Sequence, residues 1–350
     1  MVAALDAVYL PEISHQQLLG LQSYFLEAVA SDRCAPLLIT YCLAGQLVSL
    51  GRYHLYAGPQ SRAGIAVYRR LTGGRITGGG QGWLGSALIL PSRDSLLPQG
   101  ASALKPEQVI NRYVRGVLAG LRALGGDGFY PGRDAVTVNR REIATCSFEI
   151  DSSGALLFET IVAATRGLEA LVQDLEILDP DGTLTCPMYT SDTATNLARE
   201  LGRDVAADDL ARAFEAGYET LLDGFKRREL TDDERSQAEY RGARLEASGW
   251  LTARKRHPSL TLVGRERIQL GFAEAHLALN DEGKIERIMM AGDFIANSGG
   301  LAEFERALVG KRLDLMGVSA AAAKIYADGT NYILGLGDLT NLSRVIMKAS

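Results

Sequence analysis

A glycine-rich stretch, RRLTGGRITGGGQGW, runs from Arg69 to Trp83 and constrains the fold more than any other part of the chain. It contains six glycines and three arginines in fifteen residues and has no carboxylate. Glycine adopts positive φ and lets backbone amides approach a neighbour closely, so such a stretch forms either a tight hairpin or a cradle for an anion. The flanking segments GIAVYRRL and WLGSALILP are rich in β-branched and apolar residues, which predicts strands.

Two nucleotide motifs can be tested against this stretch. Residues 80–85, GQGWLG, match G-x-G-x-x-G, but a dinucleotide site needs a helix directly afterwards because the pyrophosphate binds free helical amides. A strand ending in proline follows instead, and no Gly-Lys-Ser/Thr completes a Walker loop. Two interpretations remain, a structural hairpin and an anion site. In the second, Gly73 and Gly74 expose amides while Arg70 and Arg75 bind the anion.

Length and composition indicate a globular protein with more than one core. At 350 residues the chain exceeds what one ordinary core holds, so two domains are expected. A net charge of −5 argues against a nucleic-acid binder, which would carry a basic face. No apolar run is long enough to span a membrane, and the first residues lack the basic region of a secretion signal. We therefore expect a cytoplasmic protein.

Cysteine and histidine are scarce and scattered. The four cysteines form no C-x-x-C pair, and the four histidines form no H-E-x-x-H run. We expect reduced thiols and no metal site. A Ser-His-Asp hydrolase is also disfavoured, because no G-x-S-x-G elbow occurs.

The order of helical and extended patterns predicts a mixed α+β protein. Ser14 is the expected N-cap of the first helix. Helical spacing is expected over residues 15–30, 106–125, 206–227, 231–250, 301–310 and 316–327. Extended runs are expected over residues 36–52, 64–71, 83–91, 135–151, 155–164 and 260–295. The basic run Arg254-Lys255-Arg256 precedes Pro258 and predicts a linker, which divides the chain into domains 1–257 and 258–350.

Several segments lie in the order and spacing seen in one known family. LVSLGRYH, GIAVYRRLTGG, VTVNRREIATCSFEI and TATNL (residues 193–197) resemble four segments of the lipoate–protein ligase A family. The family's counterparts are a G-R strand, an R-R-x-S/T-G-G loop, a V-N-G-K-K-I-S-G-S-A hairpin and a V-T-N-L segment. The tail, with DEGKIERIMMAGDFI and LAEFERALVGKRL, resembles the family's small C-terminal accessory domain. The resemblance covers nearly the whole chain.

This resemblance implies a class II biotin-synthetase-like fold, in which helices flank a mixed sheet and the substrate lies in a tunnel beside the R-R-x-x-G-G loop. It implies an enzyme that activates lipoate or octanoate with ATP and Mg²⁺ as an acyl-adenylate. The acyl group then passes to a lysine of a lipoyl-carrier protein, an H-protein or an E2-like domain. Such a site must hold a phosphate and stabilise charge that develops on the acyl carbonyl.

When the family's motifs are matched to this sequence, they give a set of candidate binding residues and two positions where the sign of the charge is reversed. The family's signature lysine falls on Glu142, and a basic residue that commonly follows the hairpin falls on Glu149. The loop departs as well, because the family's aromatic-His-Asp reads Gly78-Gly79-Gly80 and its His-Gly-Thr reads Phe158-Glu159-Thr160. The residues expected to contact the cofactor or acyl ligand are Arg70, Gly73, Gly74, Arg75, Gly78, Gly79, Asn139 and Glu149.

A related branch of the superfamily transfers octanoyl groups through a cysteine thioester. Its P-C-G turn is matched only by Pro180-Asp181-Gly182, and Cys186 follows four residues later. Cys146 lies on the hairpin close to Glu142. A buried cysteine is most often inert packing, and without a basic neighbour its thiol pKa stays near the ordinary value. Cys146 and Cys186 are therefore weak candidate nucleophiles.

Three functional hypotheses remain open from the sequence. The first is a divergent lipoate or octanoate ligase or transferase in which Arg140, Arg141 or Arg254 replaces the missing lysine. The second is a catalytically disabled homologue that binds an acyl ligand, a lipoyl domain or a partner ligase. The third is the same scaffold with a different, cationic substrate, which Glu142 and Glu149 would suit.

Overall fold

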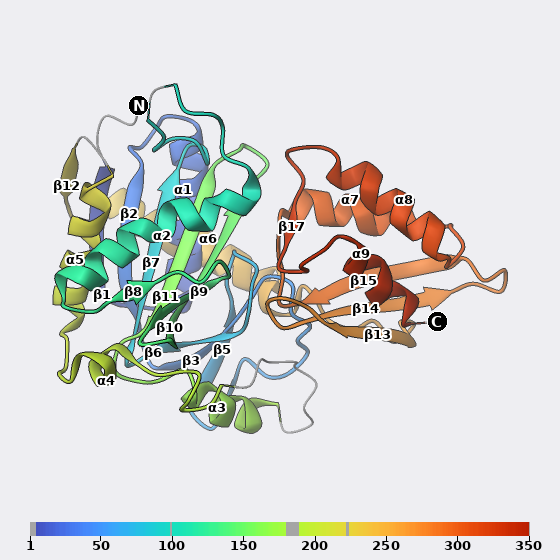
Figure 1. The fold of residues 1–350 in the computed structure, drawn as a ribbon, viewed down its shortest axis with the longest axis horizontal. Coiled ribbons are helices and arrows are strands. Elements are labelled where there is room, and N and C mark those ends of the chain that lie inside the picture. Colours follow the sequence, from blue (N-terminus) through green and yellow to red (C-terminus); the bar gives the residue numbers. More distant parts are fainter. Residues whose placement is uncertain (1–4, 99, 180–188, 222–223, 350) are drawn as a thin grey trace.

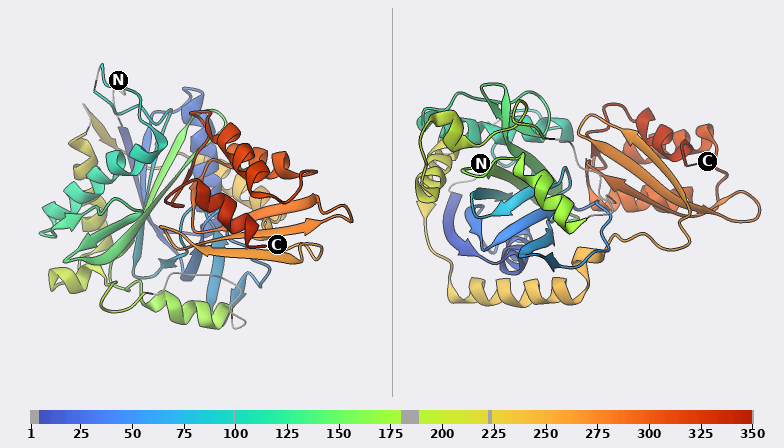
Figure 2. Two further views of the ribbon diagram at one scale, coloured as in Figure 1. Left: turned by 45° about the vertical axis from the view of Figure 1, so that its right-hand side comes forward. Right: turned by 90° about the horizontal axis from the view of Figure 1, so that it is seen from below.

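The computed structural model describes residues 5–98, 100–179, 189–221 and 224–349. The chain forms a larger lobe and a smaller carboxyl-terminal lobe side by side along the long axis of the molecule (Figure 1). The two further views keep the same arrangement (Figure 2). In the described parts of the chain no helix is both long and apolar enough to cross a membrane.

An eight-stranded mixed sheet is the centre of the larger lobe. Its order is β12-β1-β2-β7-β11-β10-β9-β8, and only the pairs β12–β1 and β1–β2 are parallel. The strands are β1 (Leu5–Ile13), β2 (Leu37–Leu43), β7 (Trp83–Leu90), β8 (Gly128–Phe129), β9 (Ala135–Val138), β10 (Arg141–Ile150), β11 (Leu156–Ala163) and β12 (Phe225–Arg227). This arrangement confirms the expected mixed sheet flanked by helices.

Two helix pairs cover the two faces of this sheet. Side chains alternate between faces along a strand, so Leu38 packs with α2 (Pro106–Ala123) and α5 (Ala207–Glu219), whereas Ile39 packs with α1 (His15–Ala30). The helix α6 (Asp232–Ala247) lies against α1, as α5 lies against α2. The short helices α3 (Ala170–Leu178), α4 (Leu197–Leu201) and η1 (Trp250–Thr252) lie in the connections.

A smaller sheet carries the glycine-rich stretch. Its order is β4-β5-β3-β6. The strands are β3 (Gln46–Leu50), β4 (Ser61–Arg62), β5 (Ile65–Arg69) and β6 (Thr77–Gly80). The loop from residue 70 to residue 76 therefore connects two strands that both pair with β3. The stretch is a strand-to-strand loop, as the flanking sequences predict.

The carboxyl-terminal lobe has its own core. The antiparallel meander β13 (Leu262–Arg267), β14 (Phe272–Leu279) and β15 (Ile285–Gly292) packs against three helices. The helices are α7 (Ser298–Leu308), α8 (Leu315–Tyr326) and α9 (Thr340–Met347). A two-stranded sheet, β16 (Ile295–Ala296) with β17 (Ile333–Leu334), completes the lobe.

A turn of the carboxyl-terminal lobe docks directly on the larger lobe. The rings of Tyr53 and Phe294 stack with centroids 5.0 Å apart, and the Tyr53 hydroxyl donates to the Ala296 carbonyl at 2.7 Å. Next to them, Nε2 of His54 and Oδ1 of Asp293 lie 3.0 Å apart with both side chains buried. These contacts place the second lobe over the glycine-rich loop.

Local predictions are mostly confirmed, with one correction. Ser14 caps α1, with its hydroxyl accepting from the Gln17 amide at 3.1 Å. The helix expected over residues 206–227 ends at Glu219, and Phe225–Arg227 form β12. The helical pattern was misleading there because β1 offers an unpaired edge, and strand pairing satisfies the backbone groups of both segments.

Candidate functional site

The loop between β5 and β6 has glycine at two points that disfavour any other residue, one for its backbone conformation and one for lack of space. Gly74 has a φ of +83°, which L-residues rarely adopt. A Cβ on Gly73 would lie 2.6 Å from the carbonyl oxygen of Phe294, a distance that would force a shift. The Gly74 amide donates to the same carbonyl at 2.8 Å. The amide that we expected to meet an anionic ligand thus binds the carboxyl-terminal lobe in this structure.

Arg70 is buried inside the loop, and its described hydrogen bonds reach the loop itself and Ser49. Its guanidinium donates to the carbonyls of Gly73 at 2.7 Å and Arg75 at 2.6 Å, and to the Thr72 hydroxyl at 3.1 Å. It also donates to the carbonyl and hydroxyl of Ser49. Arg70 therefore stabilises the conformation of the loop through these hydrogen bonds. A contact from Arg70 to a bound ligand stays a prediction.

Arg75 points to two carboxylates, that of Asp134 just before β9 and that of Glu142 on β10. Its Nε donates to Oδ2 of Asp134 at 2.7 Å, and its two Nη atoms donate to the carboxylate of Glu142 at 2.6 and 3.2 Å. A further bond at 2.9 Å reaches the hydroxyl of Tyr189. We call Arg75, Asp134 and Glu142 the acidic clamp. The residue at the signature-lysine position is thus the direct partner of the loop's third arginine.

Burial and charge oppose one another in the acidic clamp. Burial alone would lower the pKa of the Arg75 guanidinium, but Asp134, with Tyr189 and Glu142, raises it well above its ordinary value. Burial raises the pKa of the Glu142 carboxyl; Arg75 opposes the rise, and the charge of Asp134 adds to it. Arg75 therefore stays charged, and its charge is already balanced by protein carboxylates.

The segment TATNL holds Glu142 in place through the backbone. The Glu142 amide donates to the Thr193 carbonyl at 2.9 Å, and the Thr195 amide donates to the Glu142 carbonyl at 2.9 Å. The next residue, Asn196, caps α4 by accepting from the Arg199 amide. The described contacts of this motif therefore fix the strand that carries Glu142.

The basic residues near the hairpin turn lie away from the acidic clamp. Asn139 and Arg140 form the exposed turn between β9 and β10, with φ values of +51° and +66°. Asn139 donates to Glu200 at 2.8 Å, and Arg141 pairs with the same carboxylate. Neither Asn139 nor Arg141 has a bond to Glu142 among the described contacts.

Arg254 is also engaged elsewhere. It pairs with Glu305 of α7 at 3.1 Å and lies over the Tyr53 ring, 5.2 Å from its centroid. It also donates to the Met290 carbonyl. The basic linker therefore contacts the carboxyl-terminal lobe, and its first arginine does not reach the acidic clamp.

A buried carboxylate fills the interior beneath the loop. Glu159 of β11 is 1% exposed and accepts from the Tyr41 hydroxyl at 2.8 Å, the Gln22 amide at 2.9 Å and the Thr72 hydroxyl at 2.8 Å. Nε of Arg70 lies 3.9 Å from the same carboxylate. We call these residues the Glu159 network. It occupies the part of the molecule where the family resemblance predicts an acyl tunnel.

The glycines of β6 make room for aromatic side chains. A Cβ on Gly78 would lie 2.3 Å from the ring of Trp83, so the indole packs directly on the backbone. Gly79 lies against Leu43, Leu47 and Tyr68 at ordinary contact distances. The void left among these residues measures about 10 Å³, which is about the least that a single water molecule needs. Gly78 and Gly79 therefore serve packing in this structure.

Glu149 lies between the lobes. Its Oε1 accepts from the Ser298 amide at 3.1 Å and from the Ser298 hydroxyl at 2.9 Å, where α7 begins. Its Oε2 is buried and has no hydrogen-bond partner among the residues that the structure describes. Burial raises the pKa of Glu149 to about 7, against the opposing charge of Arg52 and the bonds from Ser298. Glu149 thus fastens the second lobe, and it makes no described contact with the acidic clamp.

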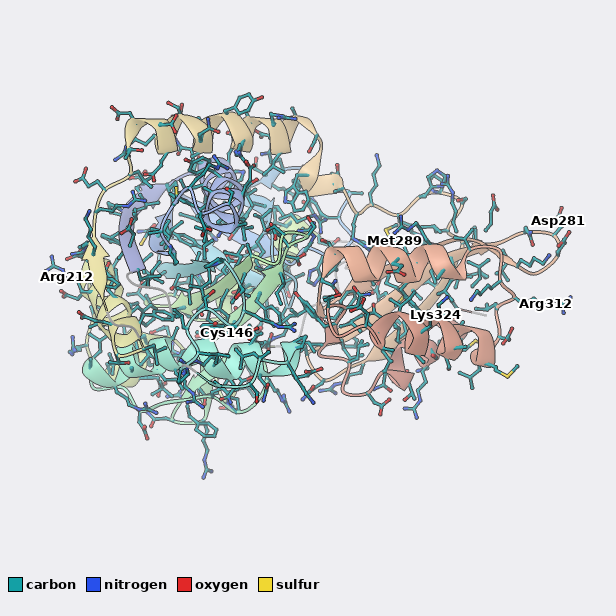
Figure 3. The ribbon with its side chains drawn as sticks, turned by 90° about the horizontal axis from the view of Figure 1, so that it is seen from above. Cys146, Arg212, Asp281, Met289, Arg312 and Lys324 are labelled. Carbon is teal, nitrogen blue, oxygen red and sulfur yellow. The ribbon has the colours of Figure 1, made fainter. Side chains whose placement is uncertain are left out.

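Cys146 is a packed core residue. It lies inside the larger lobe (Figure 3), 1% exposed, with Sγ 3.5 Å from the Thr160 hydroxyl. Burial raises the pKa of its thiol to about 12, so the thiolate is not populated at neutral pH. Pro180-Asp181-Gly182 and Cys186 lie outside the described residues.

A cavity of about 370 Å³ opens between the two lobes beside the acidic clamp. The larger lobe contributes Glu107, Tyr130 and residues 132–134 to its wall, and the carboxyl-terminal lobe contributes Tyr326 and residues 331–339. Asp134 belongs to both the clamp and the wall. Within the described residues, no group of three or more His, Cys, Asp or Glu side chains could hold a metal ion.

Sequence reasoning missed Asp134, Tyr130 and Tyr189. Asp134 follows the turn residues Pro131 and Gly132 and directly precedes the buried strand β9. An acidic residue next to an apolar run was the available signal. The two tyrosines carried no signal, because nothing local distinguishes them from packing aromatics.

Comparison with known proteins places these features on a familiar scaffold. The family model of the lipoyl protein ligase A/B catalytic domain matches residues 15–219, which is more than half of the 350-residue chain. A search of curated protein sequences gives no match. Solved structures match in fold at low sequence identity, as follows.

P. falciparum LipL1 in complex with lipoate is 11% identical, with a TM-score of 0.68 and 99% of both chains covered. A bipartite lipoate protein ligase of Thermoplasma acidophilum, described together with its E2 lipoyl domain, is 18% identical with a TM-score of 0.54; the match covers 72% of this chain and 98% of the other. A lipoate-protein ligase A bound with ATP is 17% identical with a TM-score of 0.51, covering 69% of this chain and 95% of the other. At these identities the likeness concerns the fold alone.

Proposed function

This chain belongs to the family of the lipoyl protein ligase A/B catalytic domain, and on that premise we propose that it binds a lipoyl-carrier domain without activating an acid by adenylation. The observation that carries the proposal is the ion pair of Arg75 with Glu142 and Asp134. The clamp has two carboxylates and one guanidinium, so it carries a net charge of −1 when all three are ionised. The chemistry of an acyl-adenylate requires the opposite sign there.

The free-energy cost of placing a carboxylate beside a phosphate is large enough to decide between binding and catalysis. A carboxylate about 4 Å from a phosphate costs about 4 kcal/mol at an effective dielectric constant near 20. By transition-state arithmetic that corresponds to roughly three orders of magnitude in rate. The loss is greater than this, because the attraction that a lysine would supply is missing as well.

The residues present do not fit ATP and Mg²⁺ at the clamp. The guanidinium donors of Arg70 and Arg75 described above are directed to protein carbonyls, hydroxyls and carboxylates. Oδ2 of Asp134 and both carboxylate oxygens of Glu142 accept from Arg75 instead of being free to ligate Mg²⁺. Breaking one side of a buried ion pair is costly because it leaves an uncompensated charge. We therefore derive no catalytic step that involves the nucleotide.

The interior beneath the loop also supports a binding role over acid activation. Lipoate and octanoate are chains of medium length, and the Glu159 network and the Trp83 ring fill the interior there. An ionised carboxylate is also a poor neighbour for an alkyl chain. The proposed binding partner is therefore the carrier protein and not the free acid.

A carrier domain is the partner that the family and the fold support best. One structural relative is described together with its E2 lipoyl domain. We assign residues 258–350 as the accessory domain that contributes one wall of the binding cavity. The cavity lies where both lobes supply side chains, which suits a ligand that reaches in from a bound protein.

A second candidate function is an active ligase in which Arg75 replaces the lysine. The observation in its favour is a buried, permanently charged guanidinium within hydrogen-bond distance of Glu142. This enzyme would have to release Arg75 from Glu142 when ATP binds. It predicts acid-dependent labelling of a carrier, which the first proposal does not.

Two measurements on the purified chain separate the candidates. Calorimetry with an E2 lipoyl domain and an H-protein from the same organism tests carrier binding, and incubation with labelled octanoate, ATP and Mg²⁺ tests transfer. The proposal predicts binding to a carrier and no label on it. Labelled carrier would establish the ligase, and absence of binding to either carrier would remove the binding function.

A further inference from the structure

We propose that the free edge of β15 is a docking site for an extended segment of a partner protein in which apolar and acidic residues alternate. The site is a groove of about 480 Å³ in the carboxyl-terminal lobe. Residues 286–289 of β15 line it, together with residues of the linker and of α7, which lies above this sheet in Figure 1. The groove shares no lining residue with the cavity between the lobes, so the inference does not depend on the proposed function.

The edge of β15 that faces away from β14 is partly occupied by other parts of the lobe. Among the described strands, β15 pairs with β14 alone. On the free side, the Ile285 amide donates to the Lys311 carbonyl at 2.8 Å. Further along, the Met290 amide donates to the Glu305 carboxylate at 2.8 Å, and the Met290 carbonyl accepts from Arg254. The side chains of Arg254 and Glu305 therefore take the place of a neighbouring strand at Met290.

Ile288 lies between these two points, and its backbone groups face the groove. In an antiparallel ladder, alternate residues direct their N–H and C=O groups to the same side. Met290 directs both groups to the free side, so Ile288, two residues earlier in a regular part of the ladder, does so as well. Among the contacts of the described residues, no hydrogen bond reaches the Ile288 amide or carbonyl on this side. Such an edge is a template on which an extended chain can pair.

The two faces of β15 differ in chemistry at the groove. Ile288 packs against the core of the lobe on the side of α7, and Ala302 and Val309 of α7 also line the groove. Side chains alternate along a strand, so Arg287 projects from the opposite face, where it is exposed. A segment that pairs with Ile288 places one residue on the α7 side and the next on the Arg287 side. Apolar residues suit the first position, and acidic residues suit the second.

The charges that remain available in the groove are mainly positive. Arg254 and Glu305 neutralise one another in an ion pair. Of the other lining residues, Arg287 and Arg306 are exposed basic groups, and Glu286 is an exposed acidic group. No ion pair of these last three side chains is among the described contacts. An acidic segment is therefore favoured over a basic one.

The basic run of the linker borders the same groove. Lys255 and Arg256 are exposed and lie between two lining residues, Arg254 and His257. These two side chains add to the positive charge of the two exposed arginines in the groove. The run that the sequence marked only as a linker thus has a place in the recognition of an acidic segment.

Fluorescence polarisation with the full chain and labelled hexapeptides tests the docking. The first probe alternates valine and glutamate, and the second alternates valine and lysine. We expect saturable binding of the first and at least about tenfold weaker binding of the second, which is the ratio that about 1.4 kcal/mol produces. Absence of binding by the valine–glutamate peptide, or equal binding of the two peptides, would overturn the inference.

Backbone methylation of the probe tests the strand pairing. A valine that lies opposite Ile288 directs its N–H to β15, whereas the N–H groups of the glutamates point away from β15. We therefore expect N-methylation of the valines to weaken binding at least about tenfold, by the same conversion, and N-methylation of the glutamates to leave it unchanged. The same loss in both methylated peptides would contradict strand pairing at Ile288.

Matched variants locate the site. Arg287→Glu reverses a charge in the groove, and Lys324→Glu reverses one on α8, with α7 between it and Met289 (Figure 3). Both positions are exposed, so both variants are expected to fold. We expect weaker binding of the valine–glutamate peptide, and tighter binding of the valine–lysine peptide, in Arg287→Glu alone. An equal effect in Lys324→Glu would mean that the peptide responds to the net charge of the chain, which would contradict a site in the groove.

A second copy of this chain is the competing occupant of the edge. Sedimentation velocity of the native chain, with and without the valine–glutamate peptide, distinguishes the two. We expect a monomer at the concentrations used for peptide binding. A dimer that the peptide dissociates would overturn the proposed partner and assign the edge of β15 to self-association.

Discussion

Arg75 and Glu142 form a two-pronged ion pair, with Nη2 to Oε1 at 2.6 Å and Nη1 to Oε2 at 3.2 Å. A planar guanidinium that faces a carboxylate in this way has fixed geometry on both sides. Asp134 holds the same guanidinium from Nε at 2.7 Å. The acidic residue at position 142 is therefore one partner of a well-defined ion pair, and the other partner is an arginine of the glycine-rich loop.

The first prediction concerns the strength of this pair. In a double-mutant cycle with Arg75→Met and Glu142→Gln, we expect a coupling free energy of about 1–3 kcal/mol, because the two side chains are largely buried. Urea unfolding of the four proteins measures it. The matched control is the pair Arg33–Glu27, whose side chains are 49% and 58% exposed and for which coupling below about 1 kcal/mol is expected. Equal coupling in the two cycles would contradict the account of the clamp.

The second prediction concerns pH and the junction between the lobes. Glu149 has a folded-state pKa of about 7 against an ordinary value of 4.5. The folded protein therefore binds the proton more tightly than the unfolded chain, and this group's contribution to stability is lost as pH rises from 4.5 to 7. The groups around it that influence the carboxyl are Arg52, Ser298 and Asp151.

Glu149→Gln removes this pH dependence. Between pH 5 and pH 8 we expect the native protein to lose about 2 to 3 kcal/mol of unfolding free energy relative to the variant. Denaturant unfolding at pH 5, 6, 7 and 8 gives the difference, and subtraction cancels the other titrating groups. A difference that does not change with pH, or that grows in favour of the native protein, would show that Glu149 is not buried against Ser298 as described.

The third prediction concerns the Glu159 network. Glu159→Gly removes the buried carboxylate and leaves the Tyr41 hydroxyl and the Gln22 amide without their acceptor, so we expect unfolding free energy to fall by about 2–4 kcal/mol. The variant also opens an interior space, so we expect it to bind octanoate where the native protein does not. Glu159→Gln keeps the volume and is the control. Octanoate binding by the native protein with similar affinity would show that the interior is not closed.

The fourth prediction concerns docking of the second lobe on the loop. Gly73→Ala places a Cβ 2.6 Å from the Phe294 carbonyl, whereas Gly79→Ala makes contacts no closer than 3.5 Å. We expect the first substitution to raise hydrogen exchange at the Gly74 amide and in residues 292–296. The second is expected to leave these residues unchanged. The same exchange pattern in both variants would mean that the loop does not fix the lobe.

The parts of the fold that depend on local signals could be predicted. Ser14 and Gln17 are three residues apart and form the capping pair that starts α1. The turn residues Asp281-Glu282-Gly283, which separate β14 from β15, are visible in the sequence itself. Phe225–Arg227 form a strand because they pair with the edge of β1. A local sequence pattern carries no information about a strand edge that is distant in the sequence.

The candidate site depended on distant partners. The sequence predicted both Glu142 and Arg75 as residues of the ligand site. It could not show that their side chains face one another, since 67 residues separate them. Asp134 completes the clamp from a third segment. Glu149 found its partner 149 residues away in Ser298. The sequence showed that an acidic residue replaces the lysine at position 142. Only the folded structure shows that this carboxylate pairs with Arg75.

We propose that the acidic clamp prevents acyl-adenylate formation. The measurement that tests it most directly is pyrophosphate release from ATP and Mg²⁺ by the native protein in the presence of lipoate or octanoate, beside an active lipoate–protein ligase under the same conditions. The account predicts no acid-dependent release from the native protein while the active ligase turns over. Acid-dependent release by the native protein would contradict it and would establish Arg75, or another basic group, as the replacement for the lysine.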